Sequence, residues 1–232
     1  MENINKYIFL LSVFFLNNLY GQDWPELNYY KNNNYKVGVP GVNQNRVVFM
    51  GNSITEGWSS IYPEFFEGKP YINRGISGQT TPQMLVRFRA DVIDLEPKVV
   101  VLLAGTNDIA GNTGPATVKM IADNIFSMAE LAKEHNILVI ISSVLPVYKY
   151  SWIEGELDPV PIIARLNAII KNYAQQNAHS YLDYYSEMVD SNMGLIDEYT
   201  YDGVHPNKKG YEIMSLLASK AIRTTLDKIK IN

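Results

Sequence analysis

Three polar residues of this sequence are of the types that together perform nucleophilic catalysis. Ser53 follows directly after an apolar run, and Asp202 and His205 lie three residues apart near the C-terminus. A serine hydroxyl attacks a carbonyl carbon effectively only when a neutral imidazole accepts its proton, and a carboxylate orients that imidazole and stabilises its cation. The residue types therefore predict a nucleophile at Ser53, a base at His205 and an orienting acid at Asp202.

Two other segments carry groups that stabilise a developing oxyanion. The glycines of segment 73–81 allow the main chain to approach a substrate closely and to offer an N–H group. The side-chain amide of Asn107, within the segment Gly105-Thr106-Asn107-Asp108, is a second donor of this kind. Both segments fit a reaction that places negative charge on a carbonyl oxygen.

Each of these residues also has an ordinary structural interpretation. A serine in a Gly-Asn-Ser turn often caps a helix, and Asn107 and Asp108 are common turn formers. Asp202 and His205 could instead bind a metal ion, but a metal site needs a third ligand, and the sequence contains no His-Glu-x-x-His stretch. The catalytic interpretation depends on the segments occurring together, and we expect neither a metal nor another cofactor.

The candidate residues follow apolar runs that predict strands. The predicted strands are 46–51, 70–73, 98–104, 137–144 and 180–184, and the predicted helices are 81–95, 115–135, 161–176 and 208–229. Continuously apolar strands are buried on both faces, which is typical of a parallel sheet covered by helices. The pattern predicts an α/β fold, a three-layer α/β/α sandwich with a five-stranded parallel sheet, whose functional residues lie beyond the carboxyl ends of the strands.

In this order, the segments resemble the four marker segments of the SGNH, or GDSL-type, hydrolases. The matching segments are 51–55, 75–81, 105–108 and 202–207. The resemblance extends from about residue 23 to the C-terminus. It implies a flavodoxin-like sandwich, no metal, and hydrolysis of esters or thioesters through an acyl-enzyme.

The resemblance also assigns roles to individual residues. The catalytic residues are then Ser53, Asp202 and His205, and the oxyanion hole consists of the Ser53 N–H, the Gly78 N–H and the Asn107 amide. Two positions depart from the family pattern, because Asn52 and Gln79 stand where an acidic residue is common. We expect both changes to alter the charge of the loops without abolishing activity.

The first 22 residues predict a secretory signal peptide, and residues 23–232 predict a single domain. A polar start ending at Lys6 precedes the apolar run 7–16, which is too short to cross a bilayer. Cleavage near Gly21 or Gln22 would begin the mature chain near Asp23. The sequence has no cysteine, which excludes disulfides and a lipidated N-terminal cysteine. We therefore expect an exported protein, periplasmic or secreted, whose mature chain is not inserted in a membrane.

Charge and aromatic content narrow the expected partners. The formal net charge of -4 and the lack of a basic run argue against nucleic acid. Tyr148, Tyr150 and Trp152 follow the fourth predicted strand, and Tyr199 and Tyr201 precede the Asp/His segment. Such rings stack on a sugar or line an acyl pocket, or they only pack the loops together.

We therefore predict hydrolysis of small acyl esters, with acetyl groups on carbohydrate as the preferred substrate. The alternatives are a lysophospholipase, another lipid acylhydrolase or a thioesterase of the same family, and a non-catalytic glycan- or lipid-binding protein on the same fold.

Three basic residues outside the marker segments are interpreted as structural. His135 and His179 lie at or just past the C-terminal ends of predicted helices, where a positive side chain complements the helix dipole. Arg74 is expected to form a loop salt bridge. The Asn- and Tyr-rich segment 23–45 is expected to pack against the outside of the domain.

Overall fold

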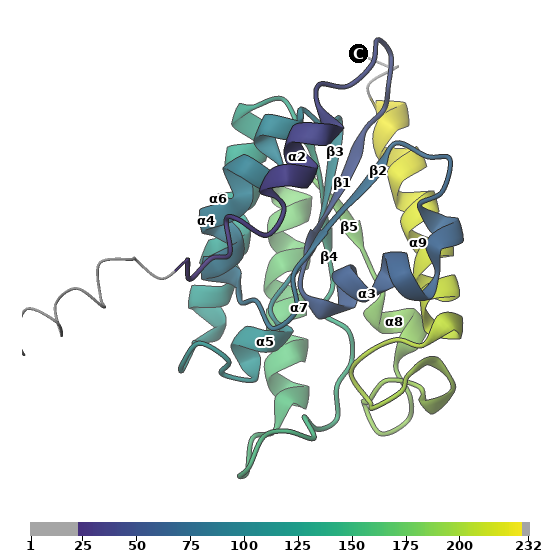
Figure 1. The fold of residues 1–232 in the computed structure, drawn as a ribbon. Coiled ribbons are helices and arrows are strands. Elements are labelled where there is room, and N and C mark those ends of the chain that lie inside the picture. The colour runs from purple at the N-terminus through teal and green to yellow at the C-terminus, as the bar shows by residue number, and fades with distance from the viewer. Residues whose placement is uncertain (1–22, 229–232) are drawn as a thin grey trace, which may run out of the picture.

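A computed structural model of the protein describes residues 23–228 and contains the predicted parallel sheet (Figure 1). Its strands are β1 (Val47–Gly51), β2 (Tyr71–Gly75), β3 (Val99–Leu103), β4 (Leu138–Ser142) and β5 (Ser180–Leu182). They are all parallel and follow the order β2-β1-β3-β4-β5. This architecture confirms the predicted α/β/α sandwich, whereas the predicted signal peptide lies outside the described residues.

Helices cover both faces of the sheet (Figure 1). The α-helices are α2 (Lys31–Val37), α3 (Ser53–Ile61), α4 (Thr81–Asp91), α5 (Thr106–Ile109), α6 (Val118–Glu134), α7 (Pro159–Gln176), α8 (Tyr185–Met188) and α9 (Lys208–Asp227). Short 3-10 turns occupy Pro63–Phe65, Ile93–Leu95 and Asp197–Tyr199. Apolar residues of α4, α6 and α7 pack into one core, and those of α3, α8 and α9 pack into the other.

The strands divide their side chains between these two cores because successive residues of a strand point to opposite faces. In β1, Val48 and Met50 join the core under α4, α6 and α7, whereas Val47 and Phe49 join the core under α3 and α9. All five residues of β1 and of β3 are buried. The continuous apolar runs of the sequence therefore reflect burial on both faces.

Capping residues set the helix boundaries, and several differ from the predicted ones. The predicted helix 81–95 ends at Asp91, and the 3-10 turn completes the range. Helix α6 begins after its cap Thr117, and α7 begins after its cap Asp158, because each cap accepts a hydrogen bond from the first turn. The cap of α9 is Asn207, so Pro206 lies before the helix.

The N-terminal segment 23–37, named here the N-terminal strap, packs against β2 and α4. Asp23 fixes its start, since its carboxylate accepts hydrogen bonds from the backbone N–H groups of Leu27 and Asn28. Asn34 of α2 donates to the Asp91 carboxylate over 2.7 Å. The strap thus lies on the outside of the domain, as predicted, and it includes a helix that the sequence pattern did not predict.

Within the described range 23–228, no helix is long and apolar enough to cross a membrane.

Candidate active site

Ser53 lies at the carboxyl end of β1, where the chain turns into α3. Asn52 caps this helix, because its Oδ1 accepts from the Ile54 N–H over 3.0 Å. Gly51 must be glycine, since a Cβ there would lie 2.0 Å from the Thr55 hydroxyl. The Ser53 N–H donates to no other described residue. A free N–H, the positive end of a helix and the serine hydroxyl therefore share one turn.

Asp202 and His205 complete a continuous chain of hydrogen bonds with Ser53. The Ser53 Oγ lies 3.0 Å from the His205 Nε2, and the His205 Nδ1 lies 2.7 Å from the Asp202 Oδ2. The other Asp202 oxygen accepts from the backbone N–H groups of His205 and Val204. The carboxylate thus fixes both the imidazole and its backbone. The structure therefore brings Ser53 together with a pair of residues that lies about 150 positions away in the sequence.

A tight loop holds the Asp/His pair at the surface. Thr200 pairs with Pro206 across the loop, and the Thr200 hydroxyl donates to the His205 carbonyl over 2.8 Å. The His205 side chain is 34% exposed and the Asp202 side chain is 40% exposed. Partial burial raises the pKa of Asp202, but hydrogen bonds from His205 and Val204 outweigh this effect, so the pKa of Asp202 lies below its usual value. Asp202 is therefore ionised at neutral pH.

The loop after β2 presents the second backbone donor. The Gln79 N–H donates to the Ile76 carbonyl, which closes a turn with Gly78 at its third position. The φ of Gly78 is +77°, a conformation that favours glycine. The Gly78 N–H has no acceptor among the described residues. Gly75 allows this loop to approach α3, since a Cβ there would lie 2.1 Å from the Glu56 nitrogen.

Asn107, in α5, supports the same loop. Its Nδ2 donates to the Gln79 carbonyl over 3.0 Å, which leaves the second hydrogen of that amide for a substrate oxygen. Asn112, which the sequence analysis did not single out, donates to the Gly78 carbonyl over 3.1 Å. Two amides therefore fix the peptide groups on either side of Gln79.

A buried polar network lies behind the loop 75–79, named here the oxyanion loop. The Asp108 carboxylate accepts from the backbone and the hydroxyl of Thr81, so Asp108 bonds to the loop as predicted. Burial raises the pKa of Asp108 to about 6, against the hydrogen bonds from Thr81, which lower it. Arg87 is fully buried and donates to the Gly51 carbonyl, the Gln79 side chain and the Asp91 carboxylate. Sequence pattern alone gave no signal for this buried arginine.

Arg74 does not form the expected salt bridge. It is buried at the end of β2, where its guanidinium donates to the side chains of Asn33 and Asn34 and lies over the Tyr30 ring. The predicted salt bridge was wrong because the partners of Arg74 are uncharged side-chain amides of the strap and not a carboxylate. His135 and His179 lie at the predicted places, at the end of α6 and just past α7.

The aromatic cluster after β4 has two different environments. Tyr150 is buried, and its hydroxyl lies 2.8 Å from the Thr106 hydroxyl, so this ring packs the loop onto the domain. Trp152 packs on Tyr150 and lies with its ring 6.2 Å from the His205 ring, while 44% of its surface stays exposed. Tyr148 and Tyr201 are more exposed still. Trp152 is thus an exposed ring fixed beside the candidate base.

A groove of about 470 Å³ adjoins the loop that carries Asp202 and His205. The groove is lined by Tyr148, Lys149, Asp190, Asn192, Gly194, Leu195, Asp197 and Gly203. The side chains of Asn192 and Asp197 make no hydrogen bond to another described residue. The groove therefore offers unpaired polar groups next to an exposed tyrosine.

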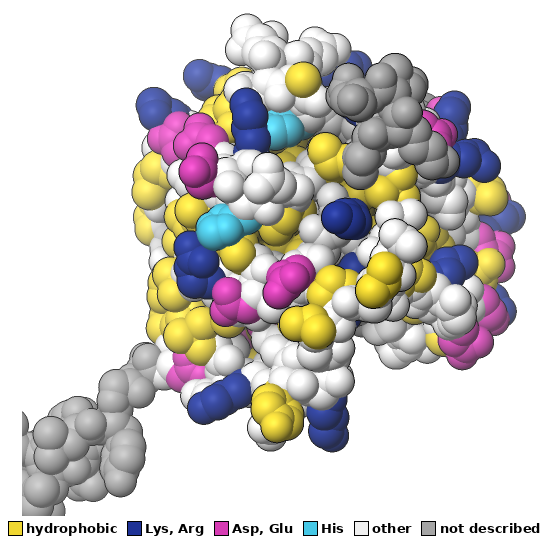
Figure 2. All heavy atoms as spheres, turned by 90° about the horizontal axis from the view of Figure 1, so that it is seen from above, with side chains coloured by type: hydrophobic (Ala, Val, Ile, Leu, Met, Phe, Trp, Pro, Cys, Tyr) yellow, Lys and Arg dark blue, Asp and Glu magenta, His cyan; other side chains and the backbone are white. Residues whose placement is uncertain are grey.

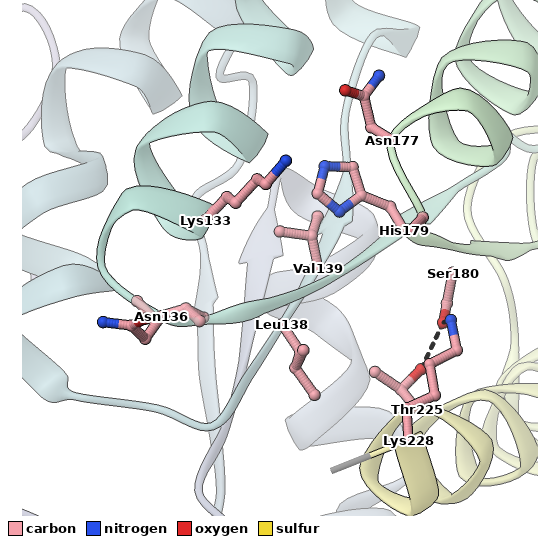
Figure 3. A pocket seen from close by; sticks show the side chains of 11 residues that line it. Lys133, Asn136, Leu138, Val139, Asn177, His179, Ser180, Thr225 and Lys228 are labelled. Atoms are coloured by element: carbon pink, nitrogen blue, oxygen red, sulfur yellow. Dashed lines mark hydrogen bonds between the residues drawn. The ribbon is translucent and has the colours of Figure 1, made fainter. Parts of the chain in front are cut away.

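Another cavity, of about 320 Å³, lies at the opposite edge of the sheet. It is formed at the amino ends of β4 and β5, and Lys133 and His179 face each other in it (Figure 3). Figure 2 shows this face of the molecule, on which positive, negative and apolar side chains are mixed. The cavity is separated from Ser53 by the length of the strands, so we do not assign it to the candidate active site.

Within the described part of the chain, no three His, Cys, Asp or Glu side chains are grouped so that they could hold a metal ion. Asp202 and His205 form a pair.

Comparison with known proteins finds a family and similar structures that cover most of this chain. The model of the GDSL-like Lipase/Acylhydrolase family matches residues 49–213. A structure from Bacteroides fragilis is 49% identical, covers 89% of this chain and 100% of its own, and superposes with a TM-score of 0.87. A GDSL-like lipase from Bacteroides thetaiotaomicron is 47% identical, with 86% and 98% of the two chains covered and a TM-score of 0.84.

More distant relatives share less of the chain. An acetyl xylan esterase, AlAXEase, has the same fold at 20% identity, with 76% and 98% of the two chains covered and a TM-score of 0.65. An uncharacterised lipoprotein of Bacillus subtilis, YqeF, is 29% identical over 48% of this chain, and the match spans about half (53%) of that relative's length. Because the family model matches most of the sequence, the chain belongs to the GDSL-like lipase/acylhydrolase family of ester-hydrolysing enzymes.

Proposed function

We propose that the protein is a serine esterase that forms an acyl-enzyme on Ser53. The observation that carries the proposal is the unbroken chain of hydrogen bonds from Ser53 Oγ through His205 to Asp202. The backbone N–H groups of Ser53 and Gly78, which have no acceptor among residues 23–228, lie on the turns that flank these three residues. A base, an orienting carboxylate and free donors are the components that acyl transfer requires.

In the first half of the reaction, the Ser53 Oγ attacks the ester carbonyl carbon and its proton passes to the His205 Nε2. The carbonyl oxygen becomes negatively charged and accepts hydrogen bonds from the N–H groups of Ser53 and Gly78 and from the Asn107 amide. Asp202 stabilises the imidazolium. The tetrahedral intermediate then breaks its bond to the alcohol, which leaves with the proton from His205.

In the second half, His205 accepts a proton from water while the water oxygen attacks the acyl carbon. The same donors hold the second oxyanion. The bond to Ser53 Oγ breaks, the serine recovers its proton from His205, and the carboxylic acid departs. These steps restore the starting state of every residue.

For the substrate, we propose small acyl esters of carbohydrates, with acetyl as the acyl group. Trp152 offers a flat exposed ring beside His205, and such rings stack on the apolar faces of sugars. The adjoining groove presents unpaired amide and carboxylate groups, which suit a leaving group rich in hydroxyls.

The enzymatic proposal is tested with p-nitrophenyl acetate and with acetylated xylo-oligosaccharides. We expect hydrolysis by the wild type and a loss of about 10⁴-fold or more in kcat for Ser53→Ala. A serine-directed fluorophosphonate should label Ser53 alone. Equal rates for wild type and Ser53→Ala would contradict the proposal, as would labelling of another residue.

The substrate proposal is tested by Trp152→Ala, with Tyr35→Ala as the control because Tyr35 is a highly exposed aromatic residue on α2. We expect Trp152→Ala to lower kcat/KM for acetylated oligosaccharide about tenfold, and to change kcat/KM for p-nitrophenyl acetate less than twofold. Equal losses on both substrates would place Trp152 in the chemistry and contradict a role in sugar binding.

We propose further that the protein is exported. Support comes from the signal-like segment 1–22 and from a relative that is named a lipoprotein. Sequencing the N-terminus of the protein recovered from its native host tests this, with cleavage near residue 22 expected and an intact Met1 contradicting it.

A further inference from the structure

The Gln79 side chain links the oxyanion loop to the N-terminal strap. The Gln79 Nε2 donates to the Pro25 carbonyl over 2.9 Å and to the Glu26 carboxylate over 3.0 Å. On its other side, the Gln79 Oε1 accepts from the Arg87 Nε over 2.5 Å. Gln79 is 1% exposed, so these partners replace water completely. The amide therefore bridges a buried cation and two acceptors of the strap.

Only an uncharged amide can both accept from Arg87 and donate to Pro25 and Glu26 at this position. A carboxylate, which is common here in the family, would satisfy Arg87 but could not donate to Pro25 and would repel Glu26. Gln79 thus departs from the family pattern because the strap supplies its own carboxylate, Glu26. Since charges buried together without compensation are costly, we expect the two positions to depend on each other.

The backbone of Gln79 carries this link into the candidate oxyanion hole. Its N–H closes the turn that fixes Gly78, and its carbonyl accepts from the Asn107 amide. Two donors of the candidate hole, the backbone Gly78 N–H and the side-chain Asn107 Nδ2, are therefore both oriented through the backbone of one residue. A displacement of the Gln79 side chain would also displace its backbone N–H and carbonyl, which fix Gly78 and Asn107.

Other strap residues hold the same loop from the outside. The Tyr30 hydroxyl donates to the Gly75 carbonyl over 2.5 Å, and the Tyr29 hydroxyl donates to Glu56. The Glu56 carboxylate in turn accepts from the Ser77 N–H over 2.9 Å. Gly75, Ser77 and Gln79 of this loop are thus bonded to the strap or to Glu56, which itself bonds the strap.

We propose that the strap completes the oxyanion hole, with Gln79 as the positioning residue and Glu26 as its partner. The inference rests on the proposed serine mechanism, because it concerns the donors of that mechanism. Gln79 touches no substrate in this arrangement. It acts by holding Gly78 and Asn107 where a developing oxyanion needs them.

The decisive variant is Gln79→Glu, which introduces repulsion toward Glu26 while keeping shape. We expect kcat for p-nitrophenyl acetate to fall about 10- to 100-fold with KM changed less than threefold, because misplaced donors weaken the transition state and not substrate binding. Adding Glu26→Gln to this variant restores a donor facing the new carboxylate. The double variant should recover most of the lost kcat, and Glu26→Gln alone should stay within about threefold of wild type.

Gln83→Glu serves as the matched control. The Gln83 Nε2 also donates to the strap, at the Trp24 carbonyl, but this residue has no bond to Gly78 or Asn107. We expect it to lower the melting temperature by an amount similar to Gln79→Glu while leaving kcat within about twofold of wild type. Equal kcat losses in the two variants would reduce Gln79 to a stability role and overturn the proposal.

A second readout does not depend on turnover. Hydrogen exchange of the segment 75–84 should be faster in Gln79→Glu than in wild type and should return toward wild type in the double variant. Unchanged exchange together with unchanged kcat would overturn the proposal. If the wild type hydrolysed no ester, the serine mechanism would fail, and the exchange data would still decide whether Gln79 and Glu26 fix the loop.

Discussion

The two sides of the candidate active site are held in different ways. On the oxyanion side, Gln79, Asn107 and Asp108 are almost fully buried. Gln79 accepts from Arg87, Asn107 donates to the Gln79 carbonyl, and Asp108 accepts from Thr81. On the base side, His205 lies on a surface loop with about a third of its side chain exposed. The first side needs fixed donors, since donors that reorganise during the reaction lose their advantage. The second needs access, because His205 gives a proton to the leaving alcohol and takes one from water.

On the base side, substitutions should therefore lower activity with little effect on stability. On the oxyanion side, they should lower both. An exposed side chain with few partners contributes little to the free energy of unfolding. When a buried polar group loses its hydrogen-bond partner, the free energy of unfolding falls by the desolvation penalty of that group. Substitutions on the two sides should therefore differ in their effects on kcat and on the free energy of unfolding.

The largest effect is expected for His205→Ala. Without a base, kcat should fall about 10⁴-fold or more, while the melting temperature should stay within about 2 °C of wild type. Steady-state kinetics and calorimetry on the same samples check this. A strongly lowered melting temperature would show that the base loop is as important to folding as the buried side.

Breaking the buried ion pair with Arg87→Met should cost about 3–5 kcal/mol in the free energy of unfolding, because Asp91 stays buried without its cation. Urea unfolding measures this. The control is Lys119→Met, which removes another i,i+4 pair, with Asp123, from an exposed helix face. No measurable change is expected for the control, and equal costs would contradict the role of burial.

Asn107→Ala should reduce both kcat and the free energy of unfolding. Removing a donor of the oxyanion hole lowers kcat about 10²- to 10³-fold, and the orphaned Gln79 carbonyl lowers the free energy of unfolding by about 1–2 kcal/mol. Asn112→Ala is the matched comparison, because it removes the same type of bond, to Gly78, without removing an oxyanion donor. Its kcat should fall less than tenfold; a loss as large as that of Asn107→Ala would contradict the assignment.

The pH dependence of stability should show the buried acid. Because the pKa of Asp108 is raised to about 6 in the folded state, the folded protein binds an extra proton between about pH 4 and 6. The contribution of Asp108 to stability should therefore fall as pH rises through this range, by at most about 3 kcal/mol. Urea unfolding of wild type and Asp108→Asn from pH 4 to 8 checks this, and parallel curves would contradict it.

The smallest effect is expected for Asn52→Asp. An aspartate can cap α3 as the amide oxygen does, so the turn should keep its shape. We expect kcat/KM to change less than tenfold. An increase of several hundredfold would mean that position 52 takes part in the reaction directly.

Most of the framework could be predicted from the sequence because burial on two faces leaves continuous apolar runs. The runs at β1 and β3 gave the sheet, and the marker segments indicated which strand ends meet. Boundaries were less accurate, since they depend on caps such as Asn207 and Asp158 that act over one turn.

The supports of the site could not be predicted in the same way. Glu26 and Gln79 are 53 residues apart and bond through side chains, so no periodic pattern joins them. The strap is rich in Asn and Tyr and has few apolar residues, so its helix α2, which buries no side chain, left no pattern either. The sequence did not show that Tyr150 is buried and Trp152 exposed, because both are aromatic residues of the same loop and their exposure depends on tertiary packing.

The strap also has a consequence for the order of events during synthesis. It is the first described part of the chain to be made, yet its partners Gly75, Gln79, Gln83 and Asp91 emerge from the ribosome dozens of residues later. A chain made from its N-terminus must therefore hold this segment unattached until β2 and α4 exist. The strap can thus bond to these partners only after the chain has been made as far as Asp91, and the oxyanion loop has its strap contacts only from then on.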